Sequence, residues 1–397
     1  MRQYSAIFAL FLAFSSHAVE GQDPVVEAIK RAEYHGSNND FDKAVQLLAP
    51  FESLQRADVD YALAEALYGK AVNGATLEAA VTADITRARA LAERAAAKGD
   101  GAALNLLFLM HENGFGVRAD GDRALEYLQR AVAAGDPGAK LNLAIRLYRG
   151  GTALGQDRDR ACGLFTELHA RPDPDPYSGY YLGLAHFRGQ CGFAEDPAKG
   201  MALIEAAARR DVREAQSDMG KNFEFGWTGD KDIKQSLAWY QLAADKGEPY
   251  AEWRIGMAYV EGDQRAKDAA QAVAWFQRSA EKEHPMGLAS LAVMVATGDG
   301  IAQDFAEAKS LYQRAADAGN AHAYRGLAVM ALRGEGGASD PERALTLYRQ
   351  AVEAGNPEEP ALLRDIQRQI ALRQRGNAVH LDKVQGVKGD SPQRIVE

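Results

Sequence analysis

The stretch from Gly287 to Asn320, GLASLAVMVATGDGIAQDFAEAKSLYQRAADAGN, has the pattern of one helical hairpin. Residues 287–297 contain no proline and show a helix-like apolar pattern, and two glycines follow in the turn. Asp304 then opens a second helix that ends at Gly319. Neither helix can bury its apolar face alone. The chain repeats the pattern about every 36 residues, which predicts a stack of hairpins.

Two ladders of residues keep this register along the chain. Glycines end the predicted first helices, because glycine adopts a left-handed backbone without steric penalty. They are Gly114, Gly150, Gly189, Gly226, Gly262, Gly298 and Gly334. Aspartates open the second helices at Asp84, Asp120, Asp157, Asp196, Asp232, Asp268, Asp304 and Asp340. A carboxylate at a helix start accepts free backbone N–H groups, so this ladder predicts N-caps and not a metal site.

The segment AEWRIGMAYVEG (251–262), followed by AVAWFQRSAEKE (272–283), resembles the Sel-one-like repeat (SLR). This repeat is a relative of the tetratricopeptide repeat, and the resemblance, to SLR proteins of the exported bacterial type, covers residues 84–355. It implies an all-α fold, namely an α-solenoid. In such a fold antiparallel helix hairpins stack into a right-handed superhelix.

The sequence divides into five predicted segments. Residues 1–18 have the pattern of a signal peptide, and residues 19–75 that of tetratricopeptide-like helices. The SLR array is predicted over 76–356. Residues 357–375 follow as a helix suited to cap the array, and the polar residues 376–397 as a disordered tail.

The N-terminal segment and the charge bear on location and partners. Arg2 precedes a wholly apolar run over 6–14, and small residues follow; an uncleaved buried helix is the alternative. The run is too short to span a bilayer, and no cysteine follows it to carry a lipid. We therefore expect a periplasmic or secreted protein with no integral membrane segment after cleavage. The net charge of −9, without a basic run, argues against nucleic acid as a partner.

The chain has two cysteines, Cys162 and Cys191. Cys162 lies near the start of one second helix, and Cys191 lies in the hairpin turn of the next repeat. Both positions fall on the same edge of a stacked array, and export would place them in an oxidising compartment. A disulfide between them is the favoured interpretation, and two separate thiols are the alternative.

The sequence shows no complete catalytic constellation. Its eight histidines are scattered, and no phosphate-binding loop is present. Ser279 and Lys282 match the S-x-x-K pattern of penicillin-binding proteins, but Ser279 occupies a small-residue position of the repeat and no K-T-G motif accompanies it. We predict no catalytic residue, no cofactor and no metal, and therefore a protein that is not an enzyme.

Protein or peptide binding is the favoured function. By analogy with tetratricopeptide proteins, partners would bind the concave face that the first helices line. Aromatic and methionine side chains suit this role. The candidates are Tyr148, Tyr177, Tyr180, Phe187, Tyr250, Trp253, Met257 and Met286. Trp253 is the sharpest candidate, because it lies outside the usual aromatic positions; packing under neighbouring repeats is the alternative for the whole set.

These observations predict an exported scaffold or adaptor that binds protein or peptide partners. Envelope assembly, exopolysaccharide export and signalling are the roles we consider. An envelope hydrolase of the penicillin-binding or β-lactamase type and a secreted host-interaction factor are the alternatives. The sequence does not specify the oligomeric state.

Overall fold

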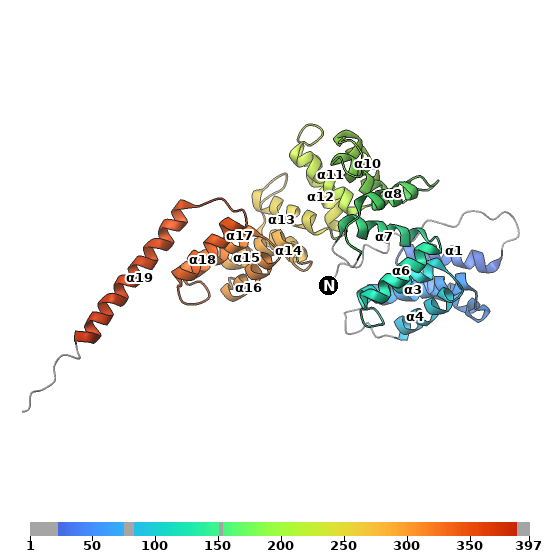
Figure 1. Ribbon diagram of the computed structural model, residues 1–397, viewed down its shortest axis with the longest axis horizontal. Coiled ribbons are helices and arrows are strands. Elements are labelled where there is room, and N and C mark those ends of the chain that lie inside the picture. The colour runs from blue at the N-terminus through green and yellow to red at the C-terminus, as the bar shows by residue number, and fades with distance from the viewer. Residues whose placement is uncertain (1–22, 75–82, 151–153, 387–397) are drawn as a thin grey trace, which may run out of the picture. The chain divides into compact units, whose positions relative to one another are not determined.

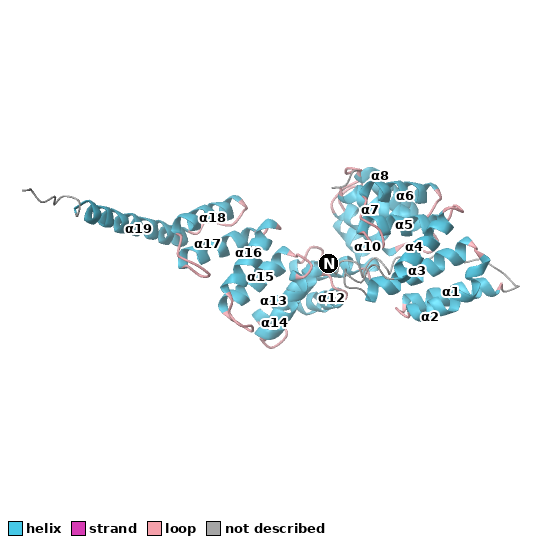
Figure 2. Ribbon diagram, turned by 90° about the horizontal axis from the view of Figure 1, so that it is seen from below, coloured by secondary structure: helices cyan, strands magenta, loops and turns pink. Residues whose placement is uncertain are grey.

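The computed structural model describes residues 23–74, 83–150 and 154–386 of the chain. Within these ranges the fold consists of nineteen α-helices and one 3-10 helix, with no strand (Figure 2). The all-α solenoid predicted from the repeats is confirmed. The predicted signal peptide lies outside the described residues.

The helices alternate between two sets along the chain. The first helices of the hairpins are α3 (Ala57–Gly74), α5 (Gly101–Asn113), α7 (Pro137–Arg149), α9 (Pro176–Phe187), α11 (Arg213–Phe225), α13 (Pro249–Glu261), α15 (Pro285–Thr297) and α17 (Ala321–Arg333). The second helices are α4 (Ala83–Ala96), α6 (Gly121–Ala133), α8 (Arg158–His169), α10 (Pro197–Arg209), α12 (Ile233–Asp245), α14 (Ala269–Ala280), α16 (Phe305–Asp317) and α18 (Pro341–Glu353). Before them come α1 (Pro24–Ser37), α2 (Phe41–Leu48) and η2 (Ala49–Leu54), and after them comes α19 (Pro360–Gly386).

The chain forms two compact units that divide at Lys231 and Asp232. Unit 1 contains α1 to α11, and unit 2 contains α12 to α19. Within each unit every helix packs against the helices that precede and follow it in the sequence. The order of the helices can be followed by colour in Figure 1. Each unit is therefore a short stack of hairpins.

Aspartates cap the second helices as the ladder predicted, with one exception. The side chains of Asp120, Asp157, Asp196, Asp232, Asp268, Asp304 and Asp340 each accept a hydrogen bond from a backbone N–H in the first turn. The prediction is wrong for Asp84, which lies inside α4, because that helix begins one residue earlier at Ala83. Its carboxylate instead forms an ion pair with Lys70, at 3.1 Å.

The glycine ladder ends the first helices as expected. Gly298, for example, is the C-cap of α15 with φ +75°, and its N–H donates to the carbonyl of Met294. A side chain is strained in this left-handed region, which explains the choice of glycine. The turn that follows brings the chain back along α16, so Val295 and Tyr312 come to lie in one core.

The first helices line the inner side of each unit. Successive first helices contact one another, namely α3 with α5, α5 with α7, α13 with α15 and α15 with α17. Among the described helices, no two successive second helices contact one another to the same extent. Where these contacts occur, each unit therefore curves toward its first helices, which we call the inner helices.

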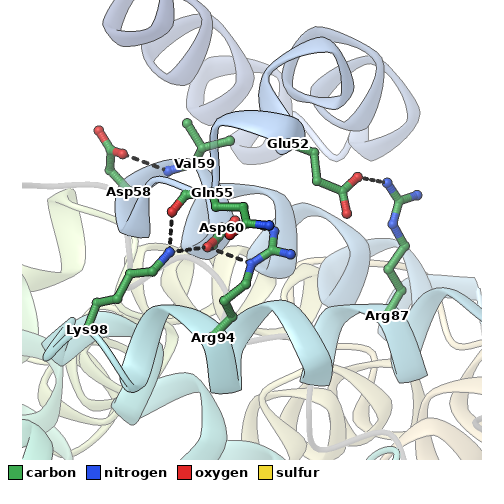
Figure 3. Close-up of polar contacts among 8 residues, drawn as sticks. All are labelled: Glu52, Gln55, Asp58, Val59, Asp60, Arg87, Arg94 and Lys98. Carbon is green, nitrogen blue, oxygen red and sulfur yellow. Dashed lines mark hydrogen bonds and ion pairs between the residues drawn. The ribbon is translucent and has the colours of Figure 1, made fainter.

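A buried carboxylate joins α3 to α4 in unit 1. Asp60 is fully buried, and its cationic partners are Arg94 of α4 and Lys98 of the turn that follows α4 (Figure 3). Arg94 donates to it from Nε at 2.8 Å, and Lys98 donates from Nζ at 3.0 Å. Burial opposes ionisation of Asp60, but the bonds from Arg94 and Lys98 outweigh it and lower the pKa of the carboxyl. The ionised form is thus part of the native packing.

The C-terminal helix α19 closes unit 2. Ile366 is fully buried against Tyr348 of α18 and the neighbouring alanines. The helix continues to Gly386, beyond the predicted end of the capping helix at Arg375, since the residues after Asn377 include no proline and several good helix formers. The segment predicted to be disordered therefore begins as helix, and its residues 387–397 lie outside the described part of the chain.

Candidate binding surfaces on the inner helices

The inner helices are joined by hydrogen bonds between residues in related register positions. Asn142 of α7 donates to Asn105 of α5 at 3.0 Å. In the same way, the hydroxyl of Tyr180 in α9 donates to Asp218 of α11 at 3.0 Å. These polar side chains lie between successive inner helices. Their hydrogen bonds stabilise the stack, and the groups involved are not available to bind a partner.

Two predicted binding residues are core residues of unit 1. Tyr148 and Tyr180 are both buried, and the hydroxyl of Tyr148 donates to Gln190 at 2.8 Å. Their rings pack against Tyr181 with centroids 5.2 Å away in each case. The expectation that these two tyrosines project from the concave face is therefore corrected, since adjacent repeats cover them. Tyr177 remains half-buried.

The four predicted residues of unit 2 lie together on two inner helices. Tyr250, Trp253 and Met257 belong to α13, Met286 lies in the first turn of α15, and all four are half-buried. Trp253 is held in place, because its Nε1 donates to the hydroxyl of Ser290 at 3.0 Å and its ring lies 5.4 Å from that of Tyr250. Trp253 thus joins α13 to α15, and replacing it would disturb packing as well as any binding.

The most exposed apolar residues on this side of unit 2 are valines that our sequence analysis did not single out. Val293 is 47% exposed and stands 36 residues after Met257, in the same register position. Val260 is 38% exposed, and it lies seven residues after Trp253 on the same face of α13. Our sequence analysis searched for aromatic residues and methionines only. Val293 shares its register position with Met257, a predicted residue, which is the one signal in the sequence that pointed to it.

We define the inner apolar surface as the residues at these two register positions in α13, α15 and α17. It consists of Met257, Val260, Val293, Ala296, Val329 and Leu332. Arg325 lies at the α17 end of this surface, and its charge is paired, because its Nη2 donates a hydrogen bond to Glu359 at 3.0 Å. This bond raises the pKa of Arg325 and lowers that of Glu359. The surface is therefore apolar with a paired charge at its margin, which suits contact with apolar side chains.

The inner side of unit 1 has a different character, because it carries carboxylates. Glu65 of α3 is half-buried and accepts a hydrogen bond from the hydroxyl of Tyr61 at 3.0 Å. Burial raises the pKa of Glu65 to about 7; the bond from Tyr61 opposes this rise, and the charges of Glu33 and Asp136 add to it. Glu65 therefore changes charge near neutral pH.

We expect Glu65→Gln to stabilise unit 1 at pH 8 by about 2 kcal/mol and to have little effect at pH 5. The folded protein holds the Glu65 proton more tightly than the unfolded chain, so wild-type stability is full below the unfolded pKa and falls as pH rises through about 7. The amide mimics the neutral acid at every pH. The value of about 2 kcal/mol is about half of the free energy that corresponds to the full pKa shift, because solvent screens this half-buried carboxyl.

Urea unfolding at both pH values measures this difference, with Glu126→Gln on the exposed face of α6 as the control. An equal gain at pH 5 and pH 8 would contradict the assignment of the titration to Glu65.

The two cysteines form a disulfide in the structure. The bond joins Cys162 in α8 to Cys191 in the turn after α9, with the Cα atoms 6.2 Å apart. It links two successive hairpins of unit 1 along the edge where the turns lie.

Ser279 is not placed to act as a nucleophile. It is fully buried in α14, and its hydroxyl donates to the carbonyl of Pro249 at 2.7 Å. Lys282 forms an ion pair with Glu252, a carboxylate that Arg278 also contacts. The S-x-x-K match therefore reflects packing of α14 against α13.

Two further properties concern the described residues only. No helix in them is long and apolar enough to cross a membrane. They also contain no group of three or more His, Cys, Asp or Glu side chains arranged to hold a metal ion.

Solved structures similar to this chain are helical repeat proteins. A Sel1 repeat protein from Oxalobacter formigenes is 24% identical with a TM-score of 0.46, covering 80% of this chain and 98% of its own. A protective antigen with an SLR fold from uropathogenic Escherichia coli is 17% identical with a TM-score of 0.34, covering 94% and 97%. A Sel1 repeat protein from Klebsiella pneumoniae is 21% identical with a TM-score of 0.33, covering 56% and 95%. No curated protein matches the sequence significantly.

The fold defines an α-solenoid whose inner helices offer surfaces for protein contact. The family model of the Sel1 repeat matches it eight times, over residues 61–100, 101–136, 137–167, 176–212, 213–248, 249–284, 285–320 and 321–356. These matches span most of the chain. The chain belongs to the Sel1 repeat family, as the resemblance in its sequence implied.

Proposed function

We propose that this protein is an exported, non-catalytic scaffold that binds a protein segment on the inner apolar surface of unit 2. The observation that carries the proposal is the exposure of Val293, in the central one of three inner helices. Apolar side chains left in water at register-related positions lower the free energy of association when a partner covers them.

The chemistry of the surface restricts the partner. The defined surface consists of aliphatic and methionine side chains, and Arg325 at the α17 end is already paired with Glu359. A segment that presents apolar side chains, such as one face of an amphipathic helix, fits such a surface. A highly charged segment would lose hydration there without gaining an ion pair.

Export is part of the proposal and rests on the sequence of residues 1–18. The disulfide between Cys162 and Cys191 supports it, because such bonds persist in oxidising compartments such as the periplasm. A scaffold in that place would act in envelope assembly, exopolysaccharide export or signalling. The buried hydroxyl of Ser279 argues against the hydrolase alternative.

We expect Val293→Asp to weaken partner binding by at least about tenfold while leaving the fold intact. A charge at this position must be desolvated when an apolar segment covers it, but it stays hydrated in the free protein. The partner is first captured in living cells by a photo-crosslinking residue at position 293. Its affinity for the purified wild type and variant is then measured by calorimetry.

Leu242→Asp is the matched control. Leu242 is also 47% exposed and also belongs to unit 2, but it lies on α12, a second helix. Its replacement should leave affinity unchanged, and thermal unfolding should show both variants folded. Equal losses in the two variants, or none in either, would contradict binding through the inner surface.

A further inference from the structure

Three aromatic side chains gather at one edge of unit 1. Phe187 ends α9, Phe225 ends α11, and Trp227 lies in the turn that follows. The Trp227 ring is 5.5 Å from that of Phe187 and 5.8 Å from that of Phe225. Phe225 is 46% exposed and Trp227 is 42% exposed. Together they form a contiguous apolar patch, whereas single exposed apolar residues need no explanation.

The turn that carries Trp227 is fixed by hydrogen bonds. Gly226 caps α11 in the left-handed conformation, with φ +68°. The side-chain oxygen of Asn222, which is buried, accepts from both the N–H and the hydroxyl of Thr228, at 3.2 and 3.0 Å. In the α5 hairpin the residue after the cap is Phe115, which packs on Tyr68. Trp227 is thus held in an ordered position yet left uncovered.

Two arginines gather at the turn after α9, which begins next to Phe187. Arg188 is the C-cap of α9 and follows Phe187 directly, while Arg158 lies with its guanidinium 5.8 Å from the ring of Tyr148. Both side chains are exposed. Burial raises the pKa of the Tyr148 hydroxyl, and both guanidinium groups lie close enough to oppose that rise. Glu195, which lies in the same turn, comes close to the backbone of Gly189. The two guanidinium groups thus place positive charge at the turn next to Phe187, in a chain whose net charge is −9.

We propose that Phe187, Phe225, Trp227, Arg158 and Arg188 form a second binding site, which takes an acidic protein segment carrying an aromatic or aliphatic side chain. The apolar side chain would pack on the three rings, and its neighbouring carboxylates would pair with the two guanidinium groups. This inference goes beyond the proposed function, because it concerns another unit and another chemistry. Two arginines do not make the extended basic stripe that nucleic acid requires.

The test is a selection of random displayed peptides on the full-length protein. We expect enriched peptides that combine Asp or Glu with an aromatic or aliphatic residue. Their affinity for the wild type, measured by fluorescence anisotropy, should fall at least about tenfold in Trp227→Ala and in Arg188→Glu. It should also fall as salt is added, since exposed charges are screened.

Matched variants control for loss of an aromatic ring and for charge reversal. Tyr34→Ala removes an exposed ring from α1, and Arg31→Glu reverses an exposed charge on the same helix. Neither should alter the affinity. Circular dichroism of every variant checks that it is folded.

The possible outcomes separate this site from the inner apolar surface. Peptides that lose affinity in Trp227→Ala but not in Val293→Asp support the edge site, whatever happens to the other proposal. Enriched peptides that respond only to Val293→Asp, that lack acidic residues, or that bind Trp227→Ala as tightly as the wild type overturn it. Failure to enrich any peptide overturns it as well.

Discussion

Replacing Asp60 by alanine is expected to lower the free energy of unfolding of unit 1 by about 3 kcal/mol. The Asp60 carboxylate is fully buried between α3 and α4, and it accepts hydrogen bonds from Arg94 and Lys98 (Figure 3). Without it, two cations remain beside a buried cavity. Arg94 and Lys98 are partly exposed, so water relieves some of this cost. Urea unfolding followed by circular dichroism measures the change.

Asp58→Ala is the control for Asp60→Ala. Asp58 lies two residues earlier in the same helix and also pairs with an arginine, Arg56, at 2.6 Å. Its side chain is 46% exposed, whereas that of Asp60 is fully buried, so its loss should cost less than about 1 kcal/mol. Equal effects of the two substitutions would show that burial does not set the strength of the Asp60 contacts. A double-mutant cycle with Arg94→Ala would then isolate that pair.

The hairpins and their caps could be predicted from sequence because their causes are local. A glycine such as Gly298 and an aspartate such as Asp304 act on the few residues around them, so their register predicts both helix ends. Asp84 shows where this reasoning fails. The helix there begins one residue earlier than the ladder indicates, and the carboxylate pairs with Lys70 of the preceding helix.

The binding surfaces were less predictable, because exposure depends on the residue that stands opposite in the next repeat. The hydroxyl of Tyr180 donates a hydrogen bond to Asp218 of the next inner helix, and Nε1 of Trp253 donates one to Ser290. Both side chains are therefore occupied by contacts with the next repeat. In α15, Val293 is 47% exposed, whereas Met257, at the same register position in α13, is half-buried. A single register position thus holds a half-buried side chain in one repeat and an exposed one in another. Only the packed structure separates the two.

The edge site could be inferred only in part from the sequence. Phe187 was selected as an aromatic residue of an inner helix, whereas Phe225 and Trp227 were not. The contact between Phe187 and Trp227 joins the ends of successive hairpins, and it depends on how closely α9 and α11 each pack against α10. The sequence pattern within a single repeat does not predict how closely these helices pack.

Gly200→Ala is expected to destabilise unit 1 by about 3 kcal/mol, since it separates α9 from α10. A Cβ at Gly200 would lie 2.6 Å from the backbone nitrogen of Phe187 and 2.7 Å from the carbonyl oxygen of Gly183. Backbone atoms cannot move aside as a flexible side chain can, so the helices must shift. Because Phe187 belongs to the edge site, the same shift should also weaken peptide binding there.

Gly163→Ala is the matched control, and we expect it to raise the free energy of unfolding where Gly200→Ala lowers it. Gly163 lies within α8, is exposed, and a Cβ there would meet no atom within 4 Å. Alanine should therefore stabilise the helix by about 0.5–1 kcal/mol, because it loses less backbone entropy on folding than glycine. Urea unfolding of the two variants compares a crowded helical glycine with an open one. Stabilisation by both substitutions would contradict the close approach of α9 and α10, because a Cβ at Gly200 would then fit between them.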